Sequence, residues 1–86
     1  MKVQKVPPEY SKQAAKFIES LDKKTQQSLK DGIEKIPDGD IIPYKARVSY
    51  FRLRIGGYRI LFNWLSDEQV FIALIDSRGQ AYKKGV

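Results

Sequence analysis

Arginine is the residue type whose number and placement in this chain point most directly to chemistry. All five arginines lie in the second half of the 86-residue sequence: Arg47, Arg52, Arg54, Arg59 and Arg78. Residues 44–86 carry eight basic and three acidic side chains, a net charge of +5, whereas residues 1–43 carry eight and seven, a net charge of +1. The planar guanidinium group suits paired hydrogen bonds to phosphate better than an ammonium group does. The second half is therefore expected to face a polyanion, although a basic surface that only maintains solubility would explain the lysines of the first half.

Two residue types that support much of enzyme chemistry are missing. The sequence contains no cysteine and no histidine, which excludes disulfides, zinc–thiolate sites, thiol nucleophiles and every Ser-His-Asp arrangement. We therefore expect no metal and no other cofactor. No apolar run reaches the ~18–20 residues of a membrane helix, and the first residues do not resemble a secretory signal. At 42% hydrophobic and 30% charged residues, the chain is expected to form one cytoplasmic domain over residues 1–86, with no membrane partner.

The elements that must position the arginines follow from the apolar pattern, which is helical in the first half. A short strand around Val3 and Val6 is expected to stop at Pro7-Pro8. Helical periodicity begins at Glu9, and Asp22 is expected to cap a second helix that Pro37 ends. The two apolar stripes consist of Ala14, Phe17, Ile18 and Leu21, and of Leu29, Gly32, Ile33 and Ile36. The pattern predicts an antiparallel helical hairpin in which Gly32 permits the close approach of another element.

After an expected loop over residues 38–45, the apolar period changes to two. A strand over Ser49–Ile55 is followed by a Gly56-Gly57 hairpin turn, a central strand over Tyr58–Leu65 and a third strand over Gln69–Ile75. A polar turn over Asp76–Gly79 and a short final strand at Ala81-Tyr82 are also expected. The predicted fold is α+β: an N-terminal strand and a two-helix antiparallel hairpin, packed on a three- to four-stranded, mainly antiparallel sheet.

The hairpin turn places arginines side by side on the sheet face that the helices leave open. If Gly56-Gly57 forms a two-residue turn, Arg54 lies opposite Arg59, and Arg52 projects from the same face. Like charges directly opposite each other are destabilising, so this pair requires an anion or an acidic partner. With Tyr50 in line with the arginines, and with Arg78 and Tyr82 near the rim, the face suits single-stranded nucleic acid. In the alternative interpretation, the two tyrosines are half-buried aromatics at the sheet edge.

Two local motifs carry a resemblance to a known family. The run Tyr50-Phe-Arg-Leu-Arg-Ile-Gly-Gly-Tyr-Arg-Ile-Leu-Phe62 resembles the second and third strands of RelE/ParE-superfamily toxins. The run Ile75-Asp-Ser-Arg-Gly-Gln-Ala-Tyr-Lys-Lys84 is similar to their C-terminal signature. The Leu-x-Gly that often precedes the second strand is replaced by Tyr44-Lys-Ala-Arg-Val-Ser, so this loop is expected to contact something different. The resemblance covers the whole chain and implies a RelE-like fold and the toxin of a bacterial toxin–antitoxin pair.

The resemblance also implies an activity and residue roles. The RelE branch cleaves mRNA in the ribosomal A site, with a nucleotide's own 2′-hydroxyl as nucleophile and without a metal. Arg59 matches the arginine that holds the scissile phosphate, Arg78 the arginine that stabilises the transition state, and Tyr82 the tyrosine that stacks on or orients the substrate. Because arginine is a poor general base, proton transfer would fall to Tyr82, a lysine or a ribosomal group. The expected RNA-binding residues are Arg52, Arg54, Lys83, Lys84 and Tyr50.

Partners and an alternative function follow from the same resemblance. The expected partners are a cognate, RelB-like antitoxin, the ribosome and mRNA. The ParE branch shares the fold but inhibits DNA gyrase, so a gyrase inhibitor or a non-catalytic nucleic-acid-binding module is the alternative to the nuclease. The joint presence of Arg59, Arg78 and Tyr82 favours the RelE branch.

Overall fold

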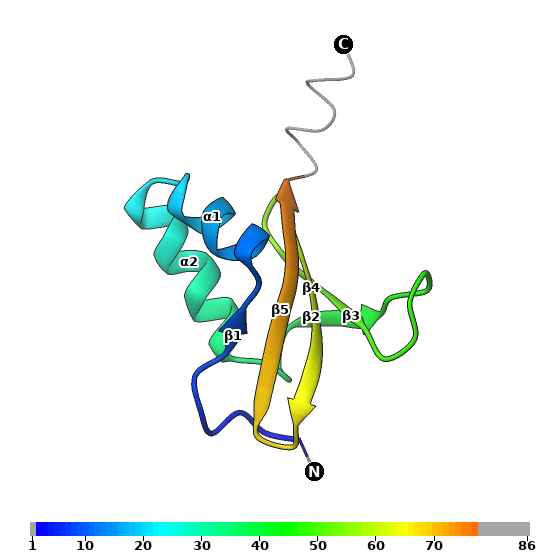
Figure 1. Ribbon diagram of the computed structural model, residues 1–86. Coiled ribbons are helices and arrows are strands. Elements are labelled where there is room, and N and C mark those ends of the chain that lie inside the picture. Colours follow the sequence, from blue (N-terminus) through cyan, green and yellow to red (C-terminus); the bar gives the residue numbers. More distant parts are fainter. Residues whose placement is uncertain (1, 78–86) are drawn as a thin grey trace.

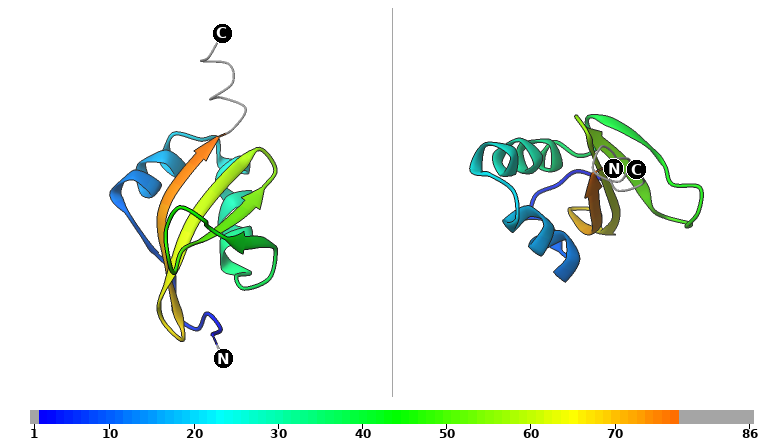
Figure 2. Two further views of the ribbon diagram at one scale, coloured as in Figure 1. Left: turned by 90° about the vertical axis from the view of Figure 1, so that its right-hand side faces the viewer. Right: turned by 90° about the horizontal axis from the view of Figure 1, so that it is seen from above.

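Five strands form one mixed sheet, and two helices cover one of its faces (Figures 1 and 2). A computed structural model describes residues 2–77. Its elements are β1 (Glu9–Tyr10), α1 (Lys12–Glu19), α2 (Lys23–Glu34), β2 (Asp40–Pro43), β3 (Phe51–Ile55), β4 (Tyr58–Ser66) and β5 (Gln69–Ser77). The strand order is β1-β5-β4-β3-β2, with β1 parallel to β5 and the other neighbours antiparallel. The predicted α+β class is confirmed, with one or two strands more than expected.

Both helices begin at a capping side chain. The Ser11 side chain accepts a hydrogen bond from the amide of Ala14, and the Asp22 side chain accepts one from the amide of Thr25, which satisfies donors that a helix start leaves open. The cap at Asp22 was predicted. The helical periodicity placed the start of α1 too early, because Glu9 and Tyr10 pair with Phe71 and Ile72 as strand β1 and the helix begins only at Lys12.

The N-terminal strand lies after the prolines rather than before them. The amides of Val3 and Lys5 donate to the carbonyls of Asp67 and Glu68 in the turn between β4 and β5, but Pro7 and Pro8 have no amide with which to continue a ladder. The described N-terminal segment therefore holds the end of the sheet through a few hydrogen bonds, and the regular strand forms only at Glu9–Tyr10.

The expected loop over residues 38–45 contains an unpredicted strand, β2. Ile41 lies opposite Leu53 of β3 and packs against the core. Pro43 is tolerated because β2 is an edge strand, where an amide donor is not required. Strand β5 is also longer than predicted and runs to Ser77, so Asp76 belongs to the sheet and not to a turn. The predicted final strand at Ala81-Tyr82 lies outside the described residues.

The core lies between the helices and the face of β3, β4 and β5 that they cover. Its largest fully buried side chains are Phe62, Leu29, Ile33, Ile36, Leu53, Ile60, Ile72, Ile75 and Val70. Gly32 lies against Ile55, and a Cβ added at this glycine would overlap the Ile55 side chain. The predicted close approach at Gly32 is therefore confirmed. Because one face of the sheet is filled by this core, the other face remains free to carry polar residues.

Candidate functional site

A row of four charged side chains crosses the sheet face that the helices leave open. Asp40 of β2 lies opposite Arg54 of β3, Arg54 lies opposite Arg59 of β4, and Arg59 lies opposite Asp76 of β5. The predicted pairing of Arg54 with Arg59 is confirmed, with Gly56 of the turn at a φ of 58°. In the neighbouring row Arg52 lies opposite Leu61.

Arg59 is paired with an acid of its own chain. Its Nη2 donates to Oδ2 of Asp76 over 2.8 Å, and the two side chains are 39% and 38% exposed. The hydrogen bond to Asp76 raises the pKa of the Arg59 guanidinium, against the opposing effect of burial. The acidic partner that the Arg54–Arg59 pair was expected to require is thus supplied within the sheet. Arg59 Nε and Asp76 Oδ1 are buried and have no hydrogen-bond partner, so the pair is held by a single bond.

The two arginines of β3 differ in accessibility. The Arg52 side chain is only 14% exposed, and its Nη1 lies 3.7 Å from Oδ2 of Asp40, too far for a hydrogen bond. Arg52 lies opposite Leu61, which is 8% exposed, and arginine stems commonly cover apolar neighbours. Arg54 is exposed, and no acid of residues 2–77 lies within ion-pair distance of it. Arg54 is therefore the arginine of this face that is most available to an external anion.

The arginines form one side of an open groove of about 390 Å³. The groove is lined by Ile42, Pro43, Tyr44, Lys45, Ala46, Arg52, Arg54 and Arg59. Four of these residues are basic, and no acidic residue of the described chain is among them. The groove therefore combines a side of three arginines with a side on which apolar and aromatic residues accompany Lys45.

The loop that joins β2 to β3 supplies the second side of the groove. Figure 2 shows it projecting from the sheet on the side away from the helices. The amide of Tyr44 donates to the carbonyl of Tyr50 over 2.9 Å and closes the loop at its base. The Arg47 guanidinium lies 4.7 Å from the centre of the Tyr50 ring, and Ser49 adopts a positive φ of 71°. Hydrogen bonds and a cation–π contact thus determine the shape of the loop.

The structure brings together three of the predicted site residues. Arg52, Arg54 and Arg59 share the groove, whereas Tyr50 is half-buried beneath Arg47 and does not line it. The other predicted site residues lie outside the described residues: Arg78, Tyr82, Lys83 and Lys84. Their roles stay predictions.

Sequence reasoning missed three residues of this face: Tyr44, Asp40 and Asp76. A signal for Asp76 was present, because a strand register counted back from a two-residue Asp67-Glu68 turn places residue 76 opposite Arg59. Asp40 could not be placed, since β2 itself was read as a loop. Tyr44 was noticed only as a departure from the family pattern.

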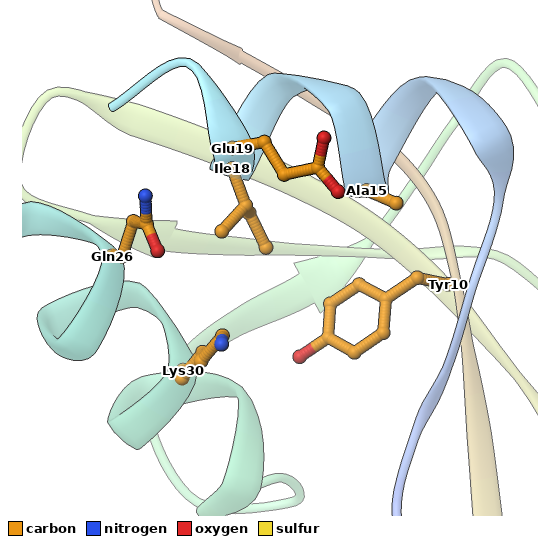
Figure 3. Close-up of a pocket in the computed structure, with 6 residues that line it drawn as sticks. All are labelled: Tyr10, Ala15, Ile18, Glu19, Gln26 and Lys30. Carbon is orange, nitrogen blue, oxygen red and sulfur yellow. The ribbon is translucent and has the colours of Figure 1, made fainter. Parts of the chain in front are cut away.

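A second hollow, of about 210 Å³, lies between the two helices (Figure 3). Tyr10 points into it from β1, Glu19 borders it from α1, and Gln26 and Lys30 border it from α2. Burial, and then the charge of Glu34, raise the pKa of the Tyr10 hydroxyl. This hollow has one cation and one acid in its lining, so it lacks the concentration of positive charge found in the groove.

Two further features of the described residues bear on function. Across residues 2–77 there is no group of three or more acidic residues placed to hold a metal ion. No helix in this range has the length and apolar character needed to cross a bilayer.

Comparison with known proteins identifies relatives of the chain. Residues 9–82 match the family described as "ParE toxin of type II toxin-antitoxin system, parDE". The toxin–antitoxin complex RelB-RelE from Methanococcus jannaschii contains a chain of the same fold, with a TM-score of 0.68 and 20% identity, covering 88% of this chain and 96% of that chain. The archaeal RelE-RelB complex from Pyrococcus horikoshii OT3 gives a TM-score of 0.65 and 23% identity, covering 93% and 99%. No curated protein is significantly similar in sequence.

Proposed function

This chain belongs to the ParE toxin family of type II toxin–antitoxin systems, and within the RelE/ParE superfamily we propose that it acts as the RelE branch does, as a ribosome-dependent endoribonuclease that cleaves mRNA. The observation that carries the proposal is the groove, in which Arg52, Arg54 and Arg59 converge and no acidic residue of the described chain takes part. A phosphodiester is the anion that such a cluster of guanidinium groups suits best. The proposed activity would place the protein in the bacterial cytoplasm, with mRNA and ribosomes.

In the proposed reaction the 2′-hydroxyl of one nucleotide attacks the adjacent phosphorus. The O2′–P bond forms as the P–O5′ bond breaks, which gives a 2′,3′-cyclic phosphate and a 5′-hydroxyl. One proton leaves the 2′-oxygen and another is delivered to the 5′-oxygen. Negative charge accumulates on the phosphoryl oxygens in the transition state, and fixed cations stabilise this charge because they need no reorganisation as it develops. We assign Arg59 to the scissile phosphate, and Arg78 and Tyr82 to the transition state and to substrate orientation.

An antitoxin is the proposed protein partner. Two structurally similar chains were solved in complex with an antitoxin, and the cationic groove is a surface that an antitoxin could neutralise. We propose that an acidic or amphipathic, RelB-like segment covers the arginines and the open sheet face, and that it folds onto this surface as it binds. Failure of any co-expressed neighbouring gene product to co-purify with the protein would contradict this assignment.

Mapping the 3′ ends of a reporter mRNA in a translating extract tests the proposed activity. We expect the added protein to produce cuts within A-site codons, and the Arg59→Ala variant to lose them. Lys16→Ala is the matched control, because it removes an exposed cation from α1, on the other side of the sheet. Circular dichroism of both variants separates lost activity from lost folding.

A gyrase supercoiling assay, run beside the mRNA mapping, distinguishes the alternative function. Intact mRNA together with inhibited DNA supercoiling by gyrase would replace the nuclease with a gyrase inhibitor. Cuts that persist unchanged in Arg59→Ala would remove Arg59 from the catalytic assignment.

A further inference from the structure

The groove has two sides of different chemistry, and the cationic side accounts for only one of them. Arg54 and Arg59 lie directly opposite each other on adjacent strands, a position in which two side chains are close enough to share one ligand. The other side consists of Ile42, Pro43, Tyr44, Lys45 and Ala46, and all of these except Lys45 are apolar or aromatic. A phosphate needs the cations but makes no use of the apolar and aromatic residues.

Tyr44 is the aromatic residue of this second side. Its backbone is fixed by the hydrogen bond to Tyr50 at the base of the loop, and its half-buried side chain lines the groove together with Arg59. The tyrosine is also close enough to the Arg59 guanidinium to contribute to the raised pKa of that group. A planar aromatic group thus lies beside the cations of the groove.

A nucleotide combines the two chemistries that the groove presents. Its phosphate matches the guanidinium groups, and its base has an apolar face that stacks on aromatic side chains whatever its sequence. The groove volume of about 390 Å³ lies within the ~300–1,000 Å³ range of small-ligand sites. A chain of carboxylates alone matches the cations but offers no planar group to the Tyr44 ring.

We propose that Tyr44 forms a base-stacking subsite, so that the groove holds one nucleotide of single-stranded RNA with its phosphate on Arg54 and Arg59 and its base on the Tyr44 ring. This proposal rests on the proposed function, since it names how the same groove contacts RNA. It also explains what the loop that replaces the usual Leu-x-Gly contacts. Tyr44 is a substrate-binding residue here and takes no part in proton transfer.

Binding of two oligomers of equal charge tests the subsite. The first is a single-stranded hexamer of adenosine nucleotides, and the second is a six-unit abasic phosphodiester. We expect the protein to bind the RNA about five- to a hundredfold more tightly, the range that corresponds to one stacked base. Tyr44→Ala is expected to lose this preference without weakening the abasic oligomer, whereas Tyr44→Phe keeps it because the ring remains.

Three outcomes would overturn the subsite. The first is equal affinity of the wild-type protein for the two oligomers. The second is an equal loss in Tyr44→Phe and Tyr44→Ala, which would make the hydroxyl the active group. The third is displacement of the RNA by hexaglutamate at equal concentration, which would show that negative charge alone accounts for the binding and that the base contributes nothing. If Tyr44→Ala does not fold, the ring protons of Tyr44 can be followed by NMR in the wild-type protein. Upfield shifts that the RNA causes and the abasic oligomer does not would support stacking. The absence of such shifts would contradict it.

Failure of the subsite and failure of the proposed nuclease are distinguishable. A protein that leaves mRNA intact in the translating extract but prefers RNA over the abasic oligomer keeps the subsite and loses the catalytic assignment. A protein that cuts mRNA without any such preference keeps the nuclease and loses the subsite.

Discussion

In the proposed site Arg59 has two opposing tasks, to bind an external anion and to hold its own carboxylate. The bond to Asp76 occupies Nη2, and Nε is buried, so a ligand has access to only part of the guanidinium. The carboxylate also neutralises one positive charge of the open face. Asp76 therefore fixes the position of Arg59 at some cost to its attraction for a polyanion.

The Asp76→Asn variant is expected to separate these two effects. Removing one negative charge from the face should raise RNA affinity by a few-fold, while cleavage under substrate saturation falls because Arg59 is held less firmly. Stability should fall by only about 0.2–1 kcal/mol, since both partners are more than one-third exposed and screened by solvent. Asp67→Asn, which removes an exposed acid from the turn between β4 and β5, is the matched control. RNA affinity and single-turnover cleavage are measured for both variants. Equal changes in the two would show that Asp76 acts only through its charge and does not position Arg59.

The sequence predicts the part of this site for which the pairing register of the strands can be derived from the length of the turn between them. A two-residue turn fixes the register of β3 against β4, so Arg54 and Arg59 were placed correctly. The register of β4 against β5 contains two irregularities, one after Leu61 and one after Trp64. They cancel, because Ser66 pairs with Gln69 and Arg59 still meets Asp76. Asp76 was missed because a polar Asp-Ser-Arg-Gly run has the composition of a turn, whereas its partner on β4 keeps it in the strand.

At the scale of the elements, local propensity predicted the helices well and the edge strand poorly. Asp22 and Gly32 are local signals, and each had the effect expected of it, whereas α2 ends at Glu34, three residues before the proline that was expected to end it. Strand β2 contains an Asp and a Pro and follows a glycine, a composition typical of loops, and it becomes a strand because Ile41 reaches the core opposite Leu53. This contact depends on tertiary structure, which local propensity does not contain.

Gly32 offers a test of how closely α2 approaches β3. Gly32→Ala is expected to lower the free energy of unfolding by about 1 kcal/mol, because overpacking against Ile55, at ~1–3 kcal/mol, outweighs the gain of up to ~1 kcal/mol in helix propensity. The corresponding fall in Tm is about 4–8 °C. Ile55→Val removes the methyl group that the new Cβ would overlap. The double variant Gly32→Ala/Ile55→Val should therefore be more stable than the sum of the two single effects predicts. Strict additivity in urea unfolding would contradict the contact.

The cap of α2 predicts a pH dependence. The hydrogen bond from the Thr25 hydroxyl lowers the pKa of Asp22 below its ordinary value of 3.8. A carboxyl with a depressed folded pKa stabilises the protein fully above its unfolded pKa, and this contribution is lost as the pH falls through the lower, folded value. Asp22→Asn keeps a good capping residue, so its Tm should match the wild type at neutral pH and fall less on acidification. Parallel Tm curves for the two proteins below about pH 4 would show that Asp22 contributes nothing.

At the scale of the whole molecule, the sheet separates two surfaces of different charge. The helical side carries most of the acids of residues 1–43 among its lysines, whereas the open side concentrates arginines around the groove. A net charge of +6 would attract RNA to any part of the surface at low salt. RNA binding can therefore depend on the groove or on the net charge of the molecule. Two variants that lose the same charge at different positions distinguish these possibilities.

Arg54→Gln and Lys16→Gln each remove one exposed cation, the first from the groove and the second from α1. Because each phosphate contact on a single strand contributes about −0.7 to the slope of log K against log salt concentration, Arg54→Gln is expected to make that slope shallower by about 0.7. Lys16→Gln should leave the slope unchanged, since its cation faces away from the groove. Fluorescence anisotropy of a labelled RNA oligomer over a series of salt concentrations measures both. Equal slopes for the two variants would mean that RNA is held by the net charge of the molecule, whereas a difference confined to Arg54→Gln means that one phosphate is bound in the groove.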